Sequence, residues 1–140
     1  MQSKIDFLRR AKVDLLVCKK TLENWSDELE FDIAAYHLQQ ALEKTLKHQI
    51  TLLGEDFNWT HEIKHLWSQL DNVGYTPPEW IWQNHQLLTD FATKTRYGES
   101  MVATKREVEE FIVLLDEYIQ QIEKPETYEE DSVFKPENNF

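Results

Sequence analysis

The spacing of apolar side chains between residues 32 and 53 restricts this chain to a helical fold. Apolar residues recur there at steps of three and four, which places them on one face of an α-helix. The predicted apolar face consists of Ala34, Ala35, Leu38, Ala41, Leu42, Leu46, Ile50 and Leu53. Because three of its early positions are alanines, we expect a neighbouring helix to approach closely. No stretch of the chain shows the convincing alternation that indicates a β-strand.

A row of polar side chains lies beside this apolar face. The row consists of His37, Gln40, Lys44 and Lys47. Their spacing makes all four project from the same side of the helix, so they form either a solvated flank or the wall of a binding site. Glu43 and Lys47 also make an i, i+4 pair in the favoured order, which contributes only about 0.2–0.5 kcal/mol on a helix surface.

The N-terminal segment predicts another amphipathic helix, beginning near Ser3 with Asp6 in its first turn. Its apolar stripe has helical steps and consists of Ile5, Leu8, Ala11, Leu15, Cys18 and Leu22. Three more apolar residues make the stripe wider than one neighbouring helix requires: Val13, Leu16 and Val17. Cys18 lies within the stripe, so we predict a buried apolar side chain and not a reactive thiol. Residues 24–30 then interrupt the helical pattern.

Three later segments complete the fold prediction. Thr60 is a suitable N-cap for a short helix over 60–73, and two prolines introduce a helix over 77–97. Thr104 opens the last helix, over 104–124, with a Ser/Thr-x-x-Glu capping box. The sequence therefore predicts an all-α fold, an up-and-down four-helix bundle with one additional short helix.

Charge and composition narrow the possible functions. We predict one helical domain over residues 1–124 and a loosely ordered tail over 125–140, which has five acidic residues, one lysine and two prolines.

The net charge of −11 argues against nucleic-acid binding through bulk electrostatics but not against a local phosphate site. A single cysteine and the absence of a signal-peptide or membrane-spanning pattern predict a cytoplasmic protein.

Residues 61–65 read His-Glu-Ile-Lys-His and match the H-E-x-x-H pattern of zinc metalloproteases. Asp71 and His85 are candidate third ligands. However, Lys64 places a cation inside the motif, and His61 would lie in the first turn of a short helix. We therefore predict polar positions on an amphipathic helix and no metal site. The glycines are isolated, so the sequence contains no phosphate-cradling loop and predicts no cofactor.

The segment over 94–99 reads Lys-Thr-Arg-Tyr-Gly-Glu and ends the predicted fourth helix. Arg96 lies there on the same flank as His85 and Thr89. An arginine near a helix C-terminus complements the helix dipole and bonds the last carbonyls. On the residues alone this structural role is favoured over a phosphate site.

Three motifs in order resemble the HEPN domain family. Residues 34–47, AAYHLQQALEKTLK, resemble the family's second-helix signature, which reads approximately A-A-F-H-x-Q-Q-A-x-E-K-x-L-K. Residues 60–63, Thr-His-Glu-Ile, resemble its Thr-His-Asp-Leu segment. Arg96 and Tyr97 resemble the Arg-Tyr pair that ends its fourth helix. The resemblance covers roughly residues 3–123, and the second-helix motif is the most specific part of it.

The resemblance implies a homodimeric helical bundle of the type that partners a minimal nucleotidyltransferase in a toxin–antitoxin-like pair. It implies binding of a nucleotide or of RNA, with Arg96 as phosphate ligand and Tyr97 as a stacking or positioning group. Lys44, Gln40 and His37 would supply supporting polar contacts. Ribonucleases of the family carry a histidine shortly after the arginine, and residues 97–103, YGESMVA, contain none. The expectation is therefore a binding protein without full ribonuclease activity.

Two alternatives stay open from the sequence. One is a metal-independent endoribonuclease toxin, in which another group replaces the missing histidine. The other is a protein-interaction module without a small ligand, whose acidic surface and tail engage a basic partner.

Overall fold

In the computed structural model, residues 5–24, 27–57, 59–93 and 104–124 are described, and every regular element in these ranges is an α-helix. The helices are α1 (Phe7–Glu23), α2 (Glu28–Leu52), α3 (Ile63–Asn72), α4 (Glu79–Gln83), α5 (His85–Thr93) and α6 (Lys105–Glu123). The predicted all-α fold is therefore confirmed. No helix in the described ranges is long and apolar enough to cross a membrane.

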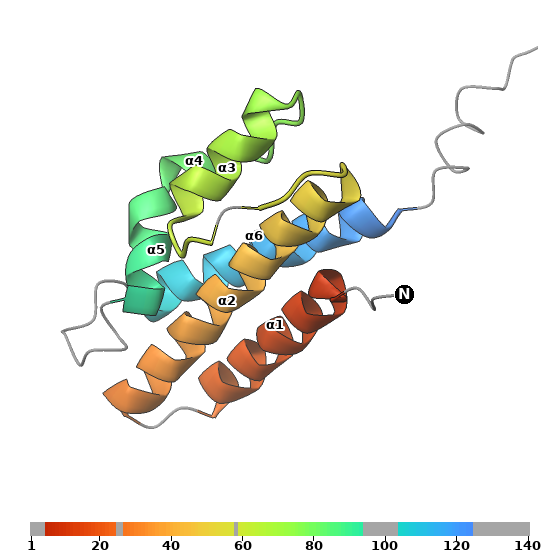
Figure 1. Ribbon diagram of the computed structural model, residues 1–140. Coiled ribbons are helices and arrows are strands. Elements are labelled where there is room, and N and C mark those ends of the chain that lie inside the picture. The colour runs from red at the N-terminus through yellow and green to blue at the C-terminus, as the bar shows by residue number, and fades with distance from the viewer. Residues whose placement is uncertain (1–4, 25–26, 58, 94–103, 125–140) are drawn as a thin grey trace, which may run out of the picture.

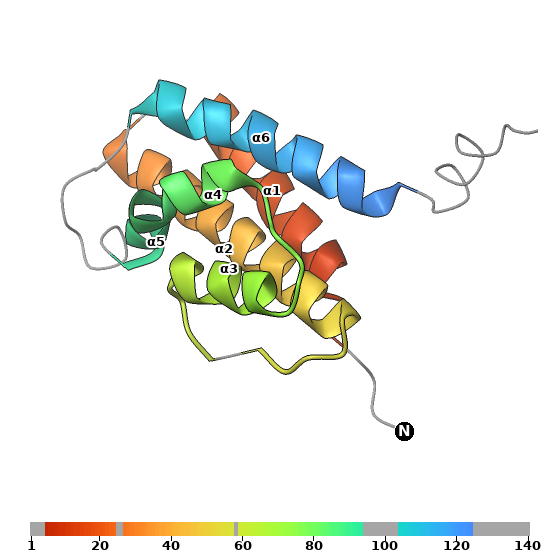
Figure 2. The same ribbon diagram turned by 90° about the horizontal axis from the view of Figure 1, so that it is seen from above.

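The long helix α2 lies at the centre of the bundle (Figures 1 and 2). It runs antiparallel to α1, and these two helices pack together more extensively than any other pair in the described ranges. The short helices α3, α4 and α5 lie on the side of α2 away from α1, while α6 packs along α2 from a third direction. Because neighbours surround α2, buried residues occur around much of its circumference, polar ones included.

Aspartate side chains set the starts of α1 and α2. Asp6 accepts a hydrogen bond from the Arg9 amide at 3.0 Å, and Asp27 accepts one from the Glu30 amide at 3.0 Å. The cap at Asp27 starts α2 at Glu28, so the predicted interruption of the helical pattern up to residue 30 extends too far.

Gly54 terminates α2, as the sequence predicted. The helix ends at Leu52, and Gly54 adopts φ +81°, a conformation that a residue with a Cβ atom rarely takes. Leu53 is the C-cap residue and is 47% exposed, so it does not belong to the apolar face to which the sequence assigned it.

The predicted single helix over 77–97 is instead two helices within the described residues. Asn84 separates α4 from α5: its side-chain amide donates to the Trp80 carbonyl at 2.8 Å. This side chain thereby takes the carbonyl that an uninterrupted helix would pair with the Asn84 backbone amide. The backbone amide donates instead to the Ile81 carbonyl at 3.3 Å, and α5 continues at a different angle.

Two predicted caps have different outcomes. The capping box at Thr104 is confirmed: the Glu107 amide donates to the Thr104 hydroxyl at 3.2 Å, and the Glu107 carboxylate accepts from the Thr104 amide at 2.9 Å. Thr60 is not the N-cap of α3, which begins three residues later at Ile63. The Ile63 amide donates to the Thr89 hydroxyl of α5 at 3.0 Å, so a side chain from another helix satisfies this N-terminal amide.

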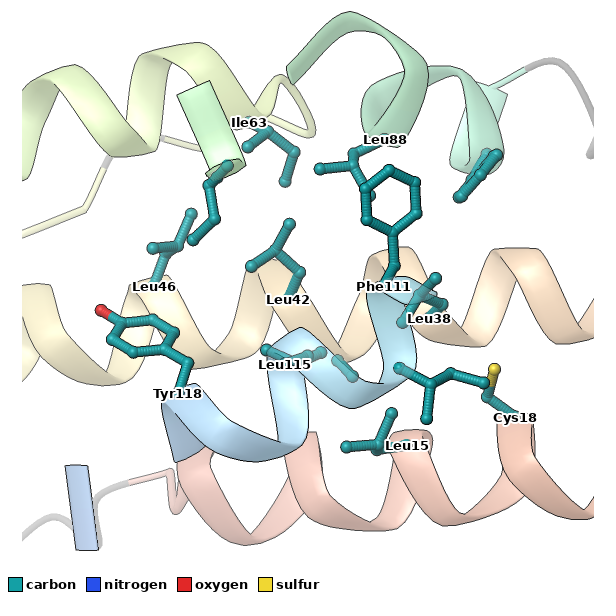
Figure 3. Close-up of a cluster of buried hydrophobic side chains, with 14 of the residues drawn as sticks. Leu15, Cys18, Leu38, Leu42, Leu46, Ile63, Leu88, Phe111, Leu115 and Tyr118 are labelled. Atoms are coloured by element: carbon teal, nitrogen blue, oxygen red, sulfur yellow. The ribbon is translucent and has the colours of Figure 1, made fainter. Parts of the chain in front are cut away.

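The apolar faces of α1, α2 and α6 meet in one core, which the short helices close from the other side (Figure 3). The three alanines of the α2 face are fully buried, which fits the close packing expected there. Cys18 is also fully buried, and burial raises the pKa of its thiol to about 12. The prediction that Cys18 is a core residue is therefore confirmed. This core fixes α2 against α1 and determines which polar side chains meet between them.

Candidate functional site

Asp14 of α1 joins two of the predicted site residues. Its Oδ1 atom lies 3.0 Å from Nδ1 of His37, and its Oδ2 atom lies 2.5 Å from Nζ of Lys44. Both partners belong to α2 and lie two turns apart, so one carboxylate bridges them across the α1–α2 contact. We call these three residues the Asp14 cluster. The structure thus brings His37 and Lys44 together, and it does so through a residue that the sequence analysis did not select.

The Asp14 cluster opens to the surface through its cationic and imidazole groups. The side chain of Asp14 is only 13% exposed, whereas those of His37 and Lys44 are 28% and 25% exposed. With Nδ1 held by Asp14, the other ring nitrogen of His37 lies on the opposite edge of the imidazole. The carboxylate therefore orients the Lys44 ammonium, which is a hydrogen-bond donor, and the His37 imidazole, and both remain reachable from solvent.

Gln40, the next residue of the predicted polar row, bonds to a second polar group. Its amide nitrogen donates to the side-chain oxygen of Gln39 at 2.8 Å. Gln39 is fully buried and donates in turn to Oε1 of Glu43 at 3.1 Å. These bonds join Gln40 to Glu43 through Gln39 and do not lead to His37 or Lys44.

Glu43 organises the second cluster, which also contains Lys47 and His61. Its Oε2 atom lies 2.7 Å from Nζ of Lys47, and its Oε1 atom lies 3.2 Å from Nδ1 of His61. Glu43 and Lys47 are only 4% and 7% exposed. Burial by itself raises the pKa of the Glu43 carboxyl, but bonds from Lys47, Gln39 and His61 outweigh it and leave the pKa below its ordinary value. We call this group the Glu43 cluster.

Aromatic rings cover the cationic end of the Glu43 cluster. Nζ of Lys47 lies 4.9 Å from the ring centroid of Phe57 and 5.7 Å from that of Trp59. The two rings pack edge to face with their centroids 5.2 Å apart. Lys47 is thus enclosed, and the polar row predicted on α2 is divided between two clusters. The pair of Glu43 and Lys47, predicted as an ordinary surface pair, is buried.

The histidines of the H-E-x-x-H pattern do not converge. His61 precedes α3, and its ring pairs with Glu43, while His65 lies within α3 with Nε2 at 3.8 Å from Glu62. Among the described residues, no group of three or more His, Cys, Asp or Glu side chains is placed to hold a metal ion. The candidate third ligand Asp71 instead accepts a hydrogen bond from Thr76 at 2.8 Å.

Comparison with known protein families identifies the domain. A model of the HEPN domain matches residues 5–124, which include the six helices of the described ranges and both clusters. This chain belongs to the HEPN domain family. Searches of curated proteins and of solved structures each found no match.

Within this HEPN domain, the signature resembling the family's second helix lies on α2 and supplies residues to both clusters. His37 and Lys44 of the signature face Asp14, while Gln39, Glu43 and Lys47 form the buried group. Its polar positions therefore include one group that reaches the surface and another that holds α2 against the segment before α3.

Two predicted site residues, Arg96 and Tyr97, lie outside the described residues. Asp14 was missed because the sequence analysis considered only the apolar side chains of this part of the first helix. It follows Ala11 by three positions and precedes Cys18 by four, so it shares the face that packs on α2. An acidic residue in such a position requires a buried partner, and this signal was present in the sequence.

Proposed function

We propose that this HEPN protein is a homodimer that binds the phosphate of a nucleotide or of RNA through the Asp14 cluster and Arg96. In this proposal it partners a nucleotidyltransferase in a cytoplasmic toxin–antitoxin-like pair and lacks full ribonuclease activity. The observation that carries the proposal is the bridge from Asp14 to His37 and Lys44. It presents the Lys44 ammonium, a hydrogen-bond donor, beside the His37 imidazole at a partly exposed position on the signature helix.

The proposed chemistry is recognition of an anion by oriented donors. The Asp14 carboxylate holds the imidazole and the ammonium in place, so less side-chain entropy is lost when a ligand binds. Because Asp14 balances the charge of Lys44, the net positive charge for a phosphate must come from another residue. Arg96 fits this role since a guanidinium binds phosphate oxygens in a bidentate manner. Tyr97 would stack on or position the ligand, and Gln40 would support the site from behind.

Binding measurements test this site directly. The affinity of the purified chain for ATP and for a short single-stranded RNA is measured by fluorescence anisotropy. We expect Arg96→Ala to weaken binding about tenfold or more, since a charged hydrogen bond contributes about 1.5–3 kcal/mol. Lys44→Ala removes a donor and leaves Asp14 less well neutralised, so it should weaken binding as well. Lys64→Ala removes a partly buried lysine of α3 and is the matched control.

The outcomes separate the parts of the proposal. If neither ATP nor RNA binds to the wild type, the proposed function is wrong. If a ligand binds and Arg96→Ala leaves its affinity unchanged, only the site assignment fails. Native co-purification with the product of the adjacent reading frame tests the nucleotidyltransferase partner separately.

The contact between Asp14 and His37 favours one alternative function. A carboxylate bonded to one nitrogen of an imidazole is the arrangement that orients a general base, with the other nitrogen available for a proton. An endoribonuclease using His37 in place of the family's downstream histidine would cleave RNA without metal. Cleavage in the presence of EDTA that is lost in His37→Ala would favour this alternative, while intact RNA would exclude it.

A further inference from the structure

A band of exposed apolar side chains runs along the surface where α1 lies beside α6. Val13 and Leu16 of α1 and Val113 of α6 are 53%, 49% and 55% exposed. They line three adjoining hollows with volumes of about 790, 670 and 510 Å³. Leu16 lines the first two hollows, and Val113 lines the last two. We call this band, with the side chains that line the hollows, the α1–α6 surface. Apolar side chains gathered on an exposed face indicate a protein partner.

The two helices of this surface carry opposite charge. α1 has five basic and two acidic side chains, a net charge of +3, although the whole chain has a net charge of −11. α6 has two basic and six acidic side chains, a net charge of −4. Two ion pairs already connect the helices within one chain: Lys12 to Glu123 at 2.7 Å and Lys19 to Asp116 at 2.6 Å. The surface therefore has a basic side on α1 and an acidic side on α6, with ion pairs crossing between them beside the apolar side chains.

We infer that the α1–α6 surface binds a second copy of the chain, with α1 of each copy against α6 of the other. This inference rests on the homodimer in the proposed function and names its interface. Consider a two-fold axis that runs parallel to α1 and α6, midway between them. It places each basic helix opposite the acidic helix of the other copy, and it places the apolar bands face to face. Such an interface is self-complementary, as a symmetric dimer requires.

The opposite charges of α1 and α6 argue against a different two-fold arrangement and against a nucleic acid at this surface. A two-fold axis across the helices would place α1 against α1 and α6 against α6, so like charges would face each other at both contacts. A nucleic acid attracted by α1 would meet the carboxylates of α6 beside it. Only a partner with an acidic and a basic edge of the same spacing satisfies both helices, and a second copy has both edges.

Sedimentation of the full-length chain tests the apolar part of the interface. The wild type is expected to sediment as a dimer with about twice the chain mass of 16.8 kDa. Leu16→Glu adds an acidic group opposite the acidic helix of the partner, so we expect the dissociation constant to rise about tenfold or more. Leu29→Glu changes a leucine of α2 that is 67% exposed and lines none of the three hollows. It should remain dimeric, and circular dichroism checks that both variants fold.

A charge exchange tests the pairing of α1 with α6. Lys20 and Glu109 both line the second hollow, one on each helix. Lys20→Glu or Glu109→Lys alone places like charges across the interface and should weaken the dimer. The double variant Lys20→Glu/Glu109→Lys restores opposite charges and should recover most of the affinity. Under the alternative axis, each single variant would place its new charge opposite a helix of opposite charge and would not weaken the dimer.

Each contrary result has a separate meaning. If the wild type is a monomer throughout the micromolar range, this interface and the proposed homodimer both fail. If the wild type is a dimer and Leu16→Glu dissociates no more than Leu29→Glu, the homodimer stands and this interface is wrong. If the single charge variants do not weaken the dimer, or if they do and the double variant does not recover, the pairing of α1 with α6 is wrong.

Discussion

The Asp14 and Glu43 clusters are built from the same groups, since each has one carboxylate that holds one lysine and one histidine. The distances are also similar: 2.5 and 3.0 Å around Asp14, and 2.7 and 3.2 Å around Glu43. They differ in where the cation lies. Lys44 keeps a quarter of its side chain exposed, whereas Lys47 is enclosed by aromatic rings and only 9% of its side chain is exposed.

This difference indicates separate roles for two similar sets of residues. A buried ion pair that is further hydrogen-bonded contributes to stability mainly because loss of one partner leaves a buried charge unpaired. A partly exposed cluster costs less to disturb, and its donors remain available to a ligand. We therefore expect the Glu43 cluster to act in stability, and the proposed binding function places the ligand at the Asp14 cluster. The predictions below separate stability from binding.

The largest expected effect is that of Glu43→Ala. This substitution leaves Lys47 buried without its carboxylate, so we expect the free energy of unfolding to fall by about 3–5 kcal/mol in urea denaturation. Glu55→Gln removes an exposed carboxylate just after α2 and is the control. The double variant Glu43→Met/Lys47→Met should be more stable than Glu43→Ala, because no unpaired charge remains. If Glu43→Ala and Glu55→Gln lower the free energy of unfolding equally, the Glu43 cluster does not have the structural role assigned to it.

Lowering the pH should reproduce part of the destabilisation caused by Glu43→Ala, because it protonates the Glu43 carboxylate in the wild type. The pKa of Glu43 in the folded protein lies below its ordinary value of 4.5, so the unfolded state binds the proton more readily. The stabilisation from Glu43 is therefore fully present above that value and is lost as pH falls through the folded pKa. Urea denaturation from about pH 6 to about pH 3 should show a smaller loss of stability in Glu43→Gln than in the wild type. Identical pH profiles would contradict the assignment.

A smaller stability effect is expected for Asp14→Ala, which affects binding as well. The variant loses two hydrogen bonds to charged or chargeable groups, but His37 and Lys44 can turn toward water. We expect a loss of about 1.5–3 kcal/mol in the free energy of unfolding and a weaker affinity for ATP or RNA. Asp14→Asn retains the shape and one acceptor, so it should lie between the wild type and Asp14→Ala. If Asp14→Ala lowers the free energy of unfolding as much as Glu43→Ala does, the Asp14 cluster also has a structural role.

The smallest stability effects are expected for the two histidines. The side chain of His61 is 60% exposed and that of His37 is 28% exposed, so each alanine variant should cost less than about 1 kcal/mol. Only His37→Ala should weaken phosphate binding, which parallel anisotropy measurements would detect. Equal affinities in the two variants would show that the polar side of α2 near Asp14 is not the binding site.

The helical content of this chain could be predicted from the sequence because periodicity and caps are local signals. The apolar faces of α1, α2 and α6 follow from side chains three and four positions apart, and the capping box at Thr104 lies within four residues. The break at Asn84 was not predicted, since it depends on a side-chain amide competing for one carbonyl. The start of α3 depends on Thr89, which lies 26 positions away.

The candidate site could be predicted only in part. The row of His37, Gln40, Lys44 and Lys47 was found because four polar residues at helical spacing share a side. Spacing along one helix cannot say what packs against that side, however. α1 supplies Asp14 to one part of the row, and the segment before α3 supplies Phe57 and Trp59 to another.

The sequence alone determined that the chain is all-α, that α2 carries the family signature and that Cys18 belongs to the core. These properties depend on local periodicity and residue type. The tertiary structure decided which lysine stays accessible and which is enclosed. It also placed the basic helix α1 beside the acidic helix α6. Contacts between helices depend on how the whole core packs, and no spacing within a single helix contains that information.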